Sequence, residues 1–477
     1  MRMKRLFQHL FRTPIGASMR LFLPAILSLV ALSGASVAQG QDRAIPDSLP
    51  ERPRIPIFEP GQPTLEKILK NGVRILVQEQ RTVYTVAGVV SFRMGTRYET
   101  EEMSGLGNVL LQTMIAGTAK SSGSDYHVRL RGTNSKLEAS VGADIGQIVI
   151  QTDREHASGA AALLSDIALY PSLPDSSFEA ARVRATGDAT FAAESPLPSA
   201  FGQFLGAMYA GTPYQRLPQG LVSAIAEARR SDLLSLHKRL AVGGNMTVVF
   251  VGNVDGKKLL AQLEKAFAAA APGTALEPAG PEPTPLAADT LIVQERPWVA
   301  HAYVVGYPAP GYRDADFPAF AMIDSYLRSE DRSPITYWMD TREEAVSPGV
   351  VWTLFPVRGS MCVYFGATPD KFAAARDTAI AVLQRLRTEP LDKGEWTVQL
   401  KRVQDGYFSK QGEPAVRARN LGRYAAQGLS LDYPRQFETA LLKLTPEDVR
   451  AAAERWFTYS CQVILGPPLA PSGDVKQ

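Results

Sequence analysis

The chain has 477 residues, 45% of them apolar and 21% charged, a composition typical of folded globular proteins that excludes a largely disordered chain. At about 100–200 residues per domain, this length predicts two to four domains. The formal net charge is +3, but the first 38 residues carry five bases and no acid, so the rest of the chain has a net charge of −2. This balance argues against nucleic acid as a partner.

The N-terminus resembles a secretory signal peptide. Basic residues precede an apolar run, Leu21–Leu32, and a site of small residues, Ser36–Ala38, follows it. The run of about 12 residues is too short to cross a bilayer core of ~30 Å. We therefore expect residues 1–38 to be removed and the mature chain to be exported without membrane insertion. An uncleaved N-terminal anchor is the alternative.

Two breaks divide the remaining chain. Residues 39–62 are rich in proline and charge and predict an extended lead-in. Residues 268–290 are rich in proline and alanine without apolar periodicity, which is typical of an interdomain linker. The predicted domains are therefore residues 63–267 and 291–467, with a short tail at 468–477.

The two predicted domains repeat one pattern. A strand, a helix and a helix–strand pair recur in the same order at offsets of about 214, 218 and 215 residues. The clearest match is between Ser231–Gly252 and Thr445–Gly466, where an amphipathic helix leads into a strand. We predict an α+β fold of two homologous α/β-sandwich halves. In each, helices are expected on one face of a mostly antiparallel sheet.

Few side chains are available for metal or nucleophilic chemistry. Cys362 and Cys461 both lie in apolar, strand-like runs, so we expect both to be buried, and a disulfide between them is left open. After the leader, the histidines are His127, His156, His237 and His301. No two of them have the spacing that would place both imidazoles on one helical face. Each is expected to be a surface or interface residue rather than a ligand.

One segment carries a specific pattern. Residues Gly105–Thr118 predict a helix that opens with glycines and stops at Gly-Thr. This segment resembles the inverzincin element of the insulinase/pitrilysin zinc-peptidase family, G-x-x-H-x-x-E-H-x-x-x-x-G-T. The glycines and the Gly-Thr pair fall in register. The two histidine positions hold Asn108 and Gln112, and the glutamate position holds Leu111.

The resemblance covers nearly the whole mature chain. The third zinc ligand of the family, 80 residues after the first histidine, falls on Asp188 rather than on a glutamate. Further matching motifs, in order, are Asn71-Gly72, Pro213-Tyr214 with Gly220, Asn245–Gly252 with Asp255, Tyr307–Pro310, Asp314–Asp316 and Thr445–Val449. The resemblance implies the family's fold, in which the two homologous halves form a clamshell.

The substitutions predict that this chain has no catalytic and no metal-binding residue. Catalytic zinc requires three protein donors and an open position for water. The amides of Asn108 and Gln112 compete poorly with imidazole for zinc, and Asp188 is one methylene shorter than the usual glutamate. Leu111 cannot act as the general base, a role worth about 10²–10⁴ in rate.

Peptide-binding positions are only partly kept. The family's substrate-binding strand carries N-A-x-T, and the matching residues here begin Glu138-Ala139, of which only Ala139 agrees. Glu138 and Ala139 are candidates for binding an extended peptide by strand addition, with an ordinary edge strand as the alternative. Arg342 is the candidate for the family's peptide-contacting arginine, although it lies in a charge cluster and no tyrosine follows seven residues later.

The resemblance implies three functional interpretations. The favoured one is a non-catalytic subunit of an exported heterodimeric zinc peptidase that helps to enclose unfolded peptides. Its partner would be a homologous chain that carries the zinc. The second is a stand-alone peptide-binding, assembly or scaffold protein. The third is an active metallopeptidase with a metal site built from other residues. The expected compartment is the periplasm, with full secretion as the alternative.

Overall fold

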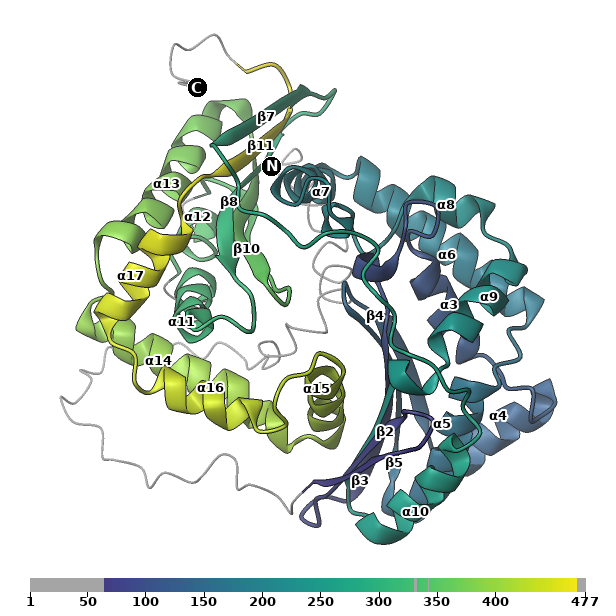
Figure 1. Ribbon diagram of the computed structural model, residues 1–477. Coiled ribbons are helices and arrows are strands. Elements are labelled where there is room, and N and C mark those ends of the chain that lie inside the picture. The colour runs from purple at the N-terminus through teal and green to yellow at the C-terminus, as the bar shows by residue number, and fades with distance from the viewer. Residues whose placement is uncertain (1–63, 330–332, 342, 470–477) are drawn as a thin grey trace, which may run out of the picture.

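A computed structural model describes residues 64–329, 333–341 and 343–469 (Figure 1). We call residues 64–267 the N-terminal half, 268–289 the linker segment and 290–469 the C-terminal half. The predicted signal peptide and Arg342 lie outside the described residues. No helix in the described part of the chain is long and apolar enough to cross a membrane.

The N-terminal half contains a six-stranded sheet in the order β1-β2-β6-β3-β5-β4. Its strands are β1 (Leu65–Ile68), β2 (Arg74–Glu79), β3 (Thr85–Arg93), β4 (Lys136–Val141), β5 (Ile145–Asp153) and β6 (Met246–Gly252). Its helices are α3 (Leu106–Met114), α4 (Gly123–Gly132), α5 (Ala157–Leu169), α6 (Asp175–Glu194), α7 (Pro196–Met208), α8 (Val222–Glu227), α9 (Arg230–Leu240) and α10 (Gly256–Phe267).

The C-terminal half contains a five-stranded sheet in the order β7-β11-β8-β10-β9. Its strands are β7 (Thr290–Glu295), β8 (His301–Pro310), β9 (Val346–Thr353), β10 (Arg358–Ala367) and β11 (Cys461–Gly466). Its helices are α11 (Phe317–Arg328), α12 (Trp338–Thr341), α13 (Pro369–Thr388), α14 (Lys393–Phe408), α15 (Pro414–Ala426), α16 (Tyr433–Leu441) and α17 (Pro446–Trp456).

The two sheets share one topology. The order β2-β6-β3-β5-β4 in the first sheet recurs as β7-β11-β8-β10-β9 in the second, and β1 is an additional edge strand. Both sheets are mixed, because β2 and β6 pair in parallel, as do β7 and β11, while all other neighbours are antiparallel. The predicted α+β class with mostly antiparallel sheets is therefore confirmed.

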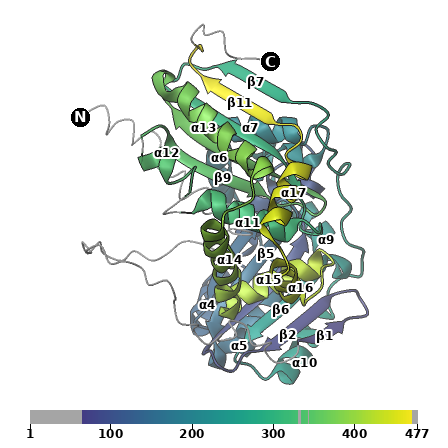
Figure 2. The same cartoon turned by 90° about the vertical axis from the view of Figure 1, so that its left-hand side faces the viewer.

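Helices cover both faces of each sheet, so the expectation of helices on one face was wrong. The outer face of the first sheet packs against helices of its own half, including α5 and α10. Its inner face packs against α15 of the C-terminal half, and the inner face of the second sheet packs against α7 of the N-terminal half. In Figure 1, α15 lies beside the first sheet and α7 beside the second, and Figure 2 gives the same arrangement seen from the side of the C-terminal half. This exchange buries apolar surface between the halves.

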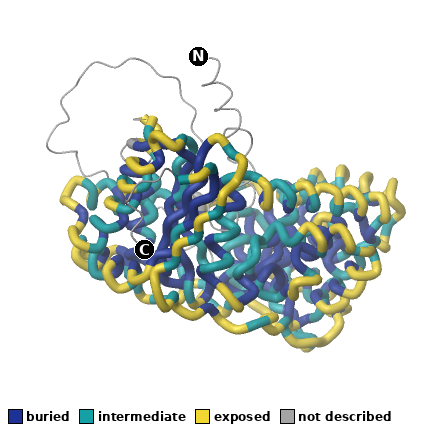
Figure 3. Tube along the Cα trace, turned by 90° about the horizontal axis from the view of Figure 1, so that it is seen from above, coloured by how far each residue is buried: buried dark blue, intermediate teal, exposed yellow. Residues whose placement is uncertain are grey.

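The double cover explains why the central strands read as nearly continuous apolar runs. All ten residues of β8 are buried, as are seven consecutive residues of β3. In Figure 3 the buried segments run through the middle of each half and the exposed ones lie outside. Because a strand buried on both faces cannot alternate with polar residues, period-two patterning is weak here. His301, expected to be a surface or interface residue, is instead buried within β8 and packs against Phe372.

The cysteines are buried, as expected, and both are free thiols. Cys362 in β10 and Cys461 in β11 both face Gly306 of β8, which lies between their strands. Two strand spacings of about 4.8 Å separate their Cα atoms by more than the ~6.8 Å that a disulfide tolerates. The sheet topology therefore answers the question that the sequence left open, against a disulfide.

Candidate functional site

Two glycines fix the start of α3, the helix that carries three of the four degenerate site positions. Gly105 precedes the helix with a left-handed φ of 92°, and Gly220, in the loop packed against it, has φ 85°. A Cβ on Gly220 would lie 2.4 Å from the Cα of Gly105, an approach that only glycine permits. These motif glycines therefore set the position of the helix.

A buried carboxylate holds the same helix terminus. Glu99 is 6% exposed, and its carboxylate oxygens accept hydrogen bonds from the backbone N–H groups of Gly105 (2.9 Å) and Gly107 (3.1 Å). A carboxylate here satisfies donors that the helix leaves unpaired and interacts favourably with the helix dipole. Burial raises the pKa of Glu99, while the two hydrogen bonds and Arg216 oppose that rise.

The two positions that the motif register aligns with the family's histidines hold amides that bind backbone carbonyls. The Nδ2 atom of Asn108 donates to the carbonyl oxygen of Pro218 (2.8 Å), and the Nε2 atom of Gln112 donates to that of Ala139 (2.9 Å). A carbonyl oxygen only accepts, so each amide turns its nitrogen toward the carbonyl. Both side chains thereby connect α3 to neighbouring segments.

The other two degenerate positions differ in burial. Leu111 is 1% exposed in the core of the N-terminal half, with its Cδ1 atom directed at Gly146 of β5. Asp188 is half-buried on α6, which packs along α3. Burial raises the pKa of Asp188, and Arg184 opposes the rise. The structure thus places all four predicted positions on two adjacent helices.

The predicted substrate strand is an edge strand, but its candidate residues have intramolecular partners. β4 is the outermost strand of its sheet. Glu138 is exposed and forms an ion pair with Arg419 from α15 of the C-terminal half. The carbonyl of Ala139 accepts the hydrogen bond from Gln112. Sequence reasoning missed Arg419, because nothing in the sequence indicates that α15 reaches the N-terminal sheet.

This donor set does not fit a catalytic zinc ion. Two amides, an aliphatic side chain and one aspartate do not supply the three strong donors and the base that such a site requires. Within the described ranges, no group of three or more His, Cys, Asp or Glu side chains is arranged to hold a metal ion.

A second polar cluster, also missed from the sequence, lies between the halves. Asp144 lies in the turn between β4 and β5. It accepts a hydrogen bond from the Tyr214 hydroxyl (2.6 Å) and forms an ion pair with Arg97 (3.5 Å). Arg97 also pairs with Glu282 of the linker segment, and the Tyr214 ring stacks on Phe355 of the C-terminal half (centroids 3.8 Å apart). Burial raises the pKa of Asp144 to about 6, although Tyr214 and Arg97 oppose the rise.

Comparison with known proteins finds matches to one peptidase family over most of the chain. The family description "Insulinase (Peptidase family M16)" matches residues 74–217, and "Peptidase M16 inactive domain" matches residues 228–402. Zinc protease PqqE of Helicobacter pylori is 23% identical over 421 residues, which cover 84% of this chain and 92% of that protein. Mitochondrial cytochrome b-c1 complex subunit 1 of Mus musculus is 24% identical over 242 residues, 51% of this chain and 47% of that protein.

Solved structures agree on the fold. The structure of a protease from Helicobacter pylori has a TM-score of 0.76 at 18% identity, covering 85% of this chain and all of that one. The structure of a peptidase M16 inactive domain from Pseudomonas fluorescens has a TM-score of 0.74 at 16% identity. The match covers 86% of this chain and 99% of that one. The two family descriptions match consecutive parts that together span about two thirds of the chain. The chain therefore belongs to the insulinase (M16) peptidase family.

Proposed function

We propose that this chain is a non-catalytic subunit of an exported M16-type peptidase assembly. In this proposal it has lost the zinc site, encloses unfolded peptides together with a homologous zinc-bearing partner, and takes no metal itself. The mature protein works in the periplasm after its signal peptide is removed.

One observation carries the proposal. At the positions where the family places two histidines, Asn108 and Gln112 donate hydrogen bonds to backbone carbonyls, and Leu111 at the position of the base is part of the core. An amide that donates to a backbone carbonyl stabilises the fold, and a buried leucine cannot activate water. The relatives include both kinds of protein, because one is named a zinc protease and another is named a subunit of a larger complex.

A second candidate function is a binding or assembly protein without a peptidase partner. Its supporting observation is the state of the β4 edge. Gln112 donates a hydrogen bond to the Ala139 carbonyl, and Arg419 forms an ion pair with Glu138. A peptide that added to this edge would have to displace the Gln112 hydrogen bond. This arrangement favours a role in assembly over a role in peptide capture.

Purification from the native host tests these alternatives. A tagged chain is captured with its partners, and zinc is measured in the complex and in the chain purified alone. A homologous chain at a one-to-one ratio, with zinc only in the pair, supports the subunit proposal. Elution without a homologous partner and without zinc overturns it in favour of a binding protein. Stoichiometric zinc in the isolated chain overturns both and indicates an active metallopeptidase.

A further inference from the structure

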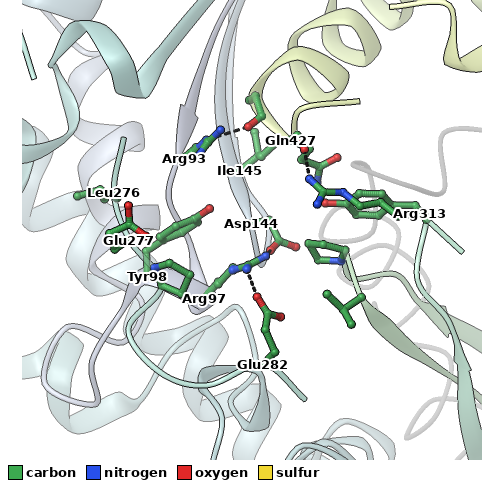
Figure 4. A pocket seen from close by; sticks show the side chains of 15 residues that line it. Arg93, Arg97, Tyr98, Asp144, Ile145, Leu276, Glu277, Glu282, Arg313 and Gln427 are labelled. Carbon is green, nitrogen blue, oxygen red and sulfur yellow. Dashed lines mark hydrogen bonds and ion pairs between the residues drawn. The ribbon is translucent and has the colours of Figure 1, made fainter. Parts of the chain in front are cut away.

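A pocket of about 250 Å³ lies where the N-terminal half, the linker segment and the C-terminal half meet (Figure 4). It is smaller than the ~300–1,000 Å³ typical of drug-sized ligands. Its walls come from the ends of β3 and β5, from the linker segment and from the C-terminal end of α15. A ligand bound here would contact all three parts of the chain at once.

Two cationic side chains in the pocket have no carboxylate partner in the described part of the chain. Arg93 donates from Nε to the carbonyl of Ala426 (2.8 Å), and Arg313 donates to the carbonyl of Gln427. Neither guanidinium forms an ion pair with any described residue. Both are therefore held in place by the end of α15 while their charge is not neutralised. In Figure 4 they approach the pocket from opposite sides.

Two carboxylates in the same pocket retain accepting capacity. Asp144 uses Oδ1 for both Tyr214 and Arg97, and its Oδ2 atom accepts no hydrogen bond within the described part of the chain. Glu277 of the linker segment is exposed at the pocket and pairs with none of the described cations. The pocket thus offers both positive and negative groups, which suits a ligand that carries both charges.

Two tyrosine hydroxyls in the walls also have no partner among the described residues. Tyr312 is 8% exposed, and its hydroxyl is buried without a hydrogen bond. Tyr98 lines the pocket within electrostatic range of Arg93 and Asp144, and its hydroxyl forms no hydrogen bond to the described part of the protein. Buried polar groups in native proteins are normally satisfied, so the unpaired Tyr312 hydroxyl is unusual. Tyr98 is only partly buried, so its hydroxyl is open to a molecule in the pocket.

We propose that this interdomain pocket binds a small zwitterion, a free amino acid or a dipeptide. Arg93 and Arg313 would bind its carboxylate, Asp144 and Glu277 would bind its ammonium group, and the Tyr98 hydroxyl would add a hydrogen bond. The ligand would hold the linker segment against both halves. This inference is independent of the zinc site and of the proposed partner, because none of these residues is among the degenerate site positions.

Calorimetric titration of the full mature chain tests the pocket with four probes: alanyl-alanine, its N-acetyl form, its C-terminal amide and inorganic phosphate. Alanyl-alanine should bind saturably, and each capped form should bind about tenfold or more weakly, since each loses a charge-assisted contact. Phosphate binding as tight as that of the dipeptide would overturn the proposal in favour of a simple anion site. Equal binding of the capped forms, or no binding of any probe, would also overturn it.

Variants assign the binding to this pocket. Tyr98→Phe removes a hydroxyl that has no partner among the described residues, so it should leave folding unchanged and weaken alanyl-alanine binding. Arg313→Met should weaken it about tenfold or more. The matched control is Arg154→Met, an exposed arginine just beyond the far end of β5, about 30 Å along the strand from Asp144. Unchanged affinity in both pocket variants would contradict the assignment.

Discussion

The α3 site and the interdomain pocket differ in how their polar groups are satisfied. Around α3, Asn108, Gln112 and Glu99 all bind backbone groups, and Glu138 binds Arg419. In the pocket, the hydroxyl of Tyr98 has no described partner and Arg93 has no counter-ion among the described residues. Polar residues that are already paired within the chain stabilise the fold, whereas groups left unpaired at a cavity leave room for a ligand. The α3 region, which the sequence motif aligns with the family's zinc site, is the one whose polar groups are already paired.

Leu111→Glu should have the largest effect on stability, because it places a carboxylate in the core of the α3 region. We expect a loss of about 3 kcal/mol or more in the free energy of unfolding, measured by urea denaturation. Leu111→Met keeps the volume and should cost less than about 1.5 kcal/mol. Equal stability of the glutamate variant and wild type would show that this position is accessible to solvent and still available for a base.

Glu99→Ala should rank second. It leaves the backbone N–H groups of Gly105 and Gly107 buried and unpaired, at about 1–3 kcal/mol each. We expect a loss of about 2–5 kcal/mol in the same denaturation experiment. Glu101→Ala, an exposed change at the same loop, should stay within about 0.5 kcal/mol of wild type. Similar losses in both variants would contradict the anchoring role of Glu99.

Asp144→Asn should change the pH dependence of stability. Burial raises the pKa of Asp144 from its ordinary 3.8 to about 6, so the folded state holds this proton more tightly than the unfolded state does. The carboxyl therefore contributes stability at low pH that is lost as the pH rises from about 4 through 6. The asparagine variant should gain stability relative to wild type between pH 5 and pH 7.5. A difference that is constant across this range would contradict the assigned pKa.

The smallest effects compare one polar group from each region. Asn108→Ala should cost about 1 kcal/mol in the free energy of unfolding, because it removes the hydrogen bond to Pro218. Tyr98→Phe should stay within about 0.5 kcal/mol, because its hydroxyl has no described partner to lose. Both are measured by denaturation without ligand. A larger loss for Tyr98→Phe than for Asn108→Ala would reverse the comparison between the two regions.

The fold could be predicted because the short motifs form helix caps and hydrogen bonds to the backbone. Asn71 donates to the carbonyls of Phe267 and Ala270, which closes the N-terminal half. Thr445 and Asp448 cap α17 reciprocally, as the Thr-x-x-Asp spacing indicates. Such local or backbone-directed roles depend on residue type at fixed spacing, so they are visible in one sequence.

The rest of the site depends on contacts between distant segments. Tyr214 and Asp144 are 70 positions apart, and Arg419 and Glu138 are 281 apart. Only the exchange of α7 and α15 between the sheets brings Arg419 to the β4 edge, and no local pattern encodes that exchange. The identity of the degenerate positions was readable from the motif register, but their hydrogen-bond partners were not.

The most direct test of the central claim is a zinc-binding measurement by equilibrium dialysis of the purified mature chain. The variant Asn108→His/Gln112→His serves as positive control, because it places two imidazoles one helical turn apart on α3, which packs against the helix that carries Asp188. We expect no stoichiometric zinc in the wild-type chain and a clear gain in the variant. One zinc ion per wild-type chain, lost on Asp188→Ala, would contradict it.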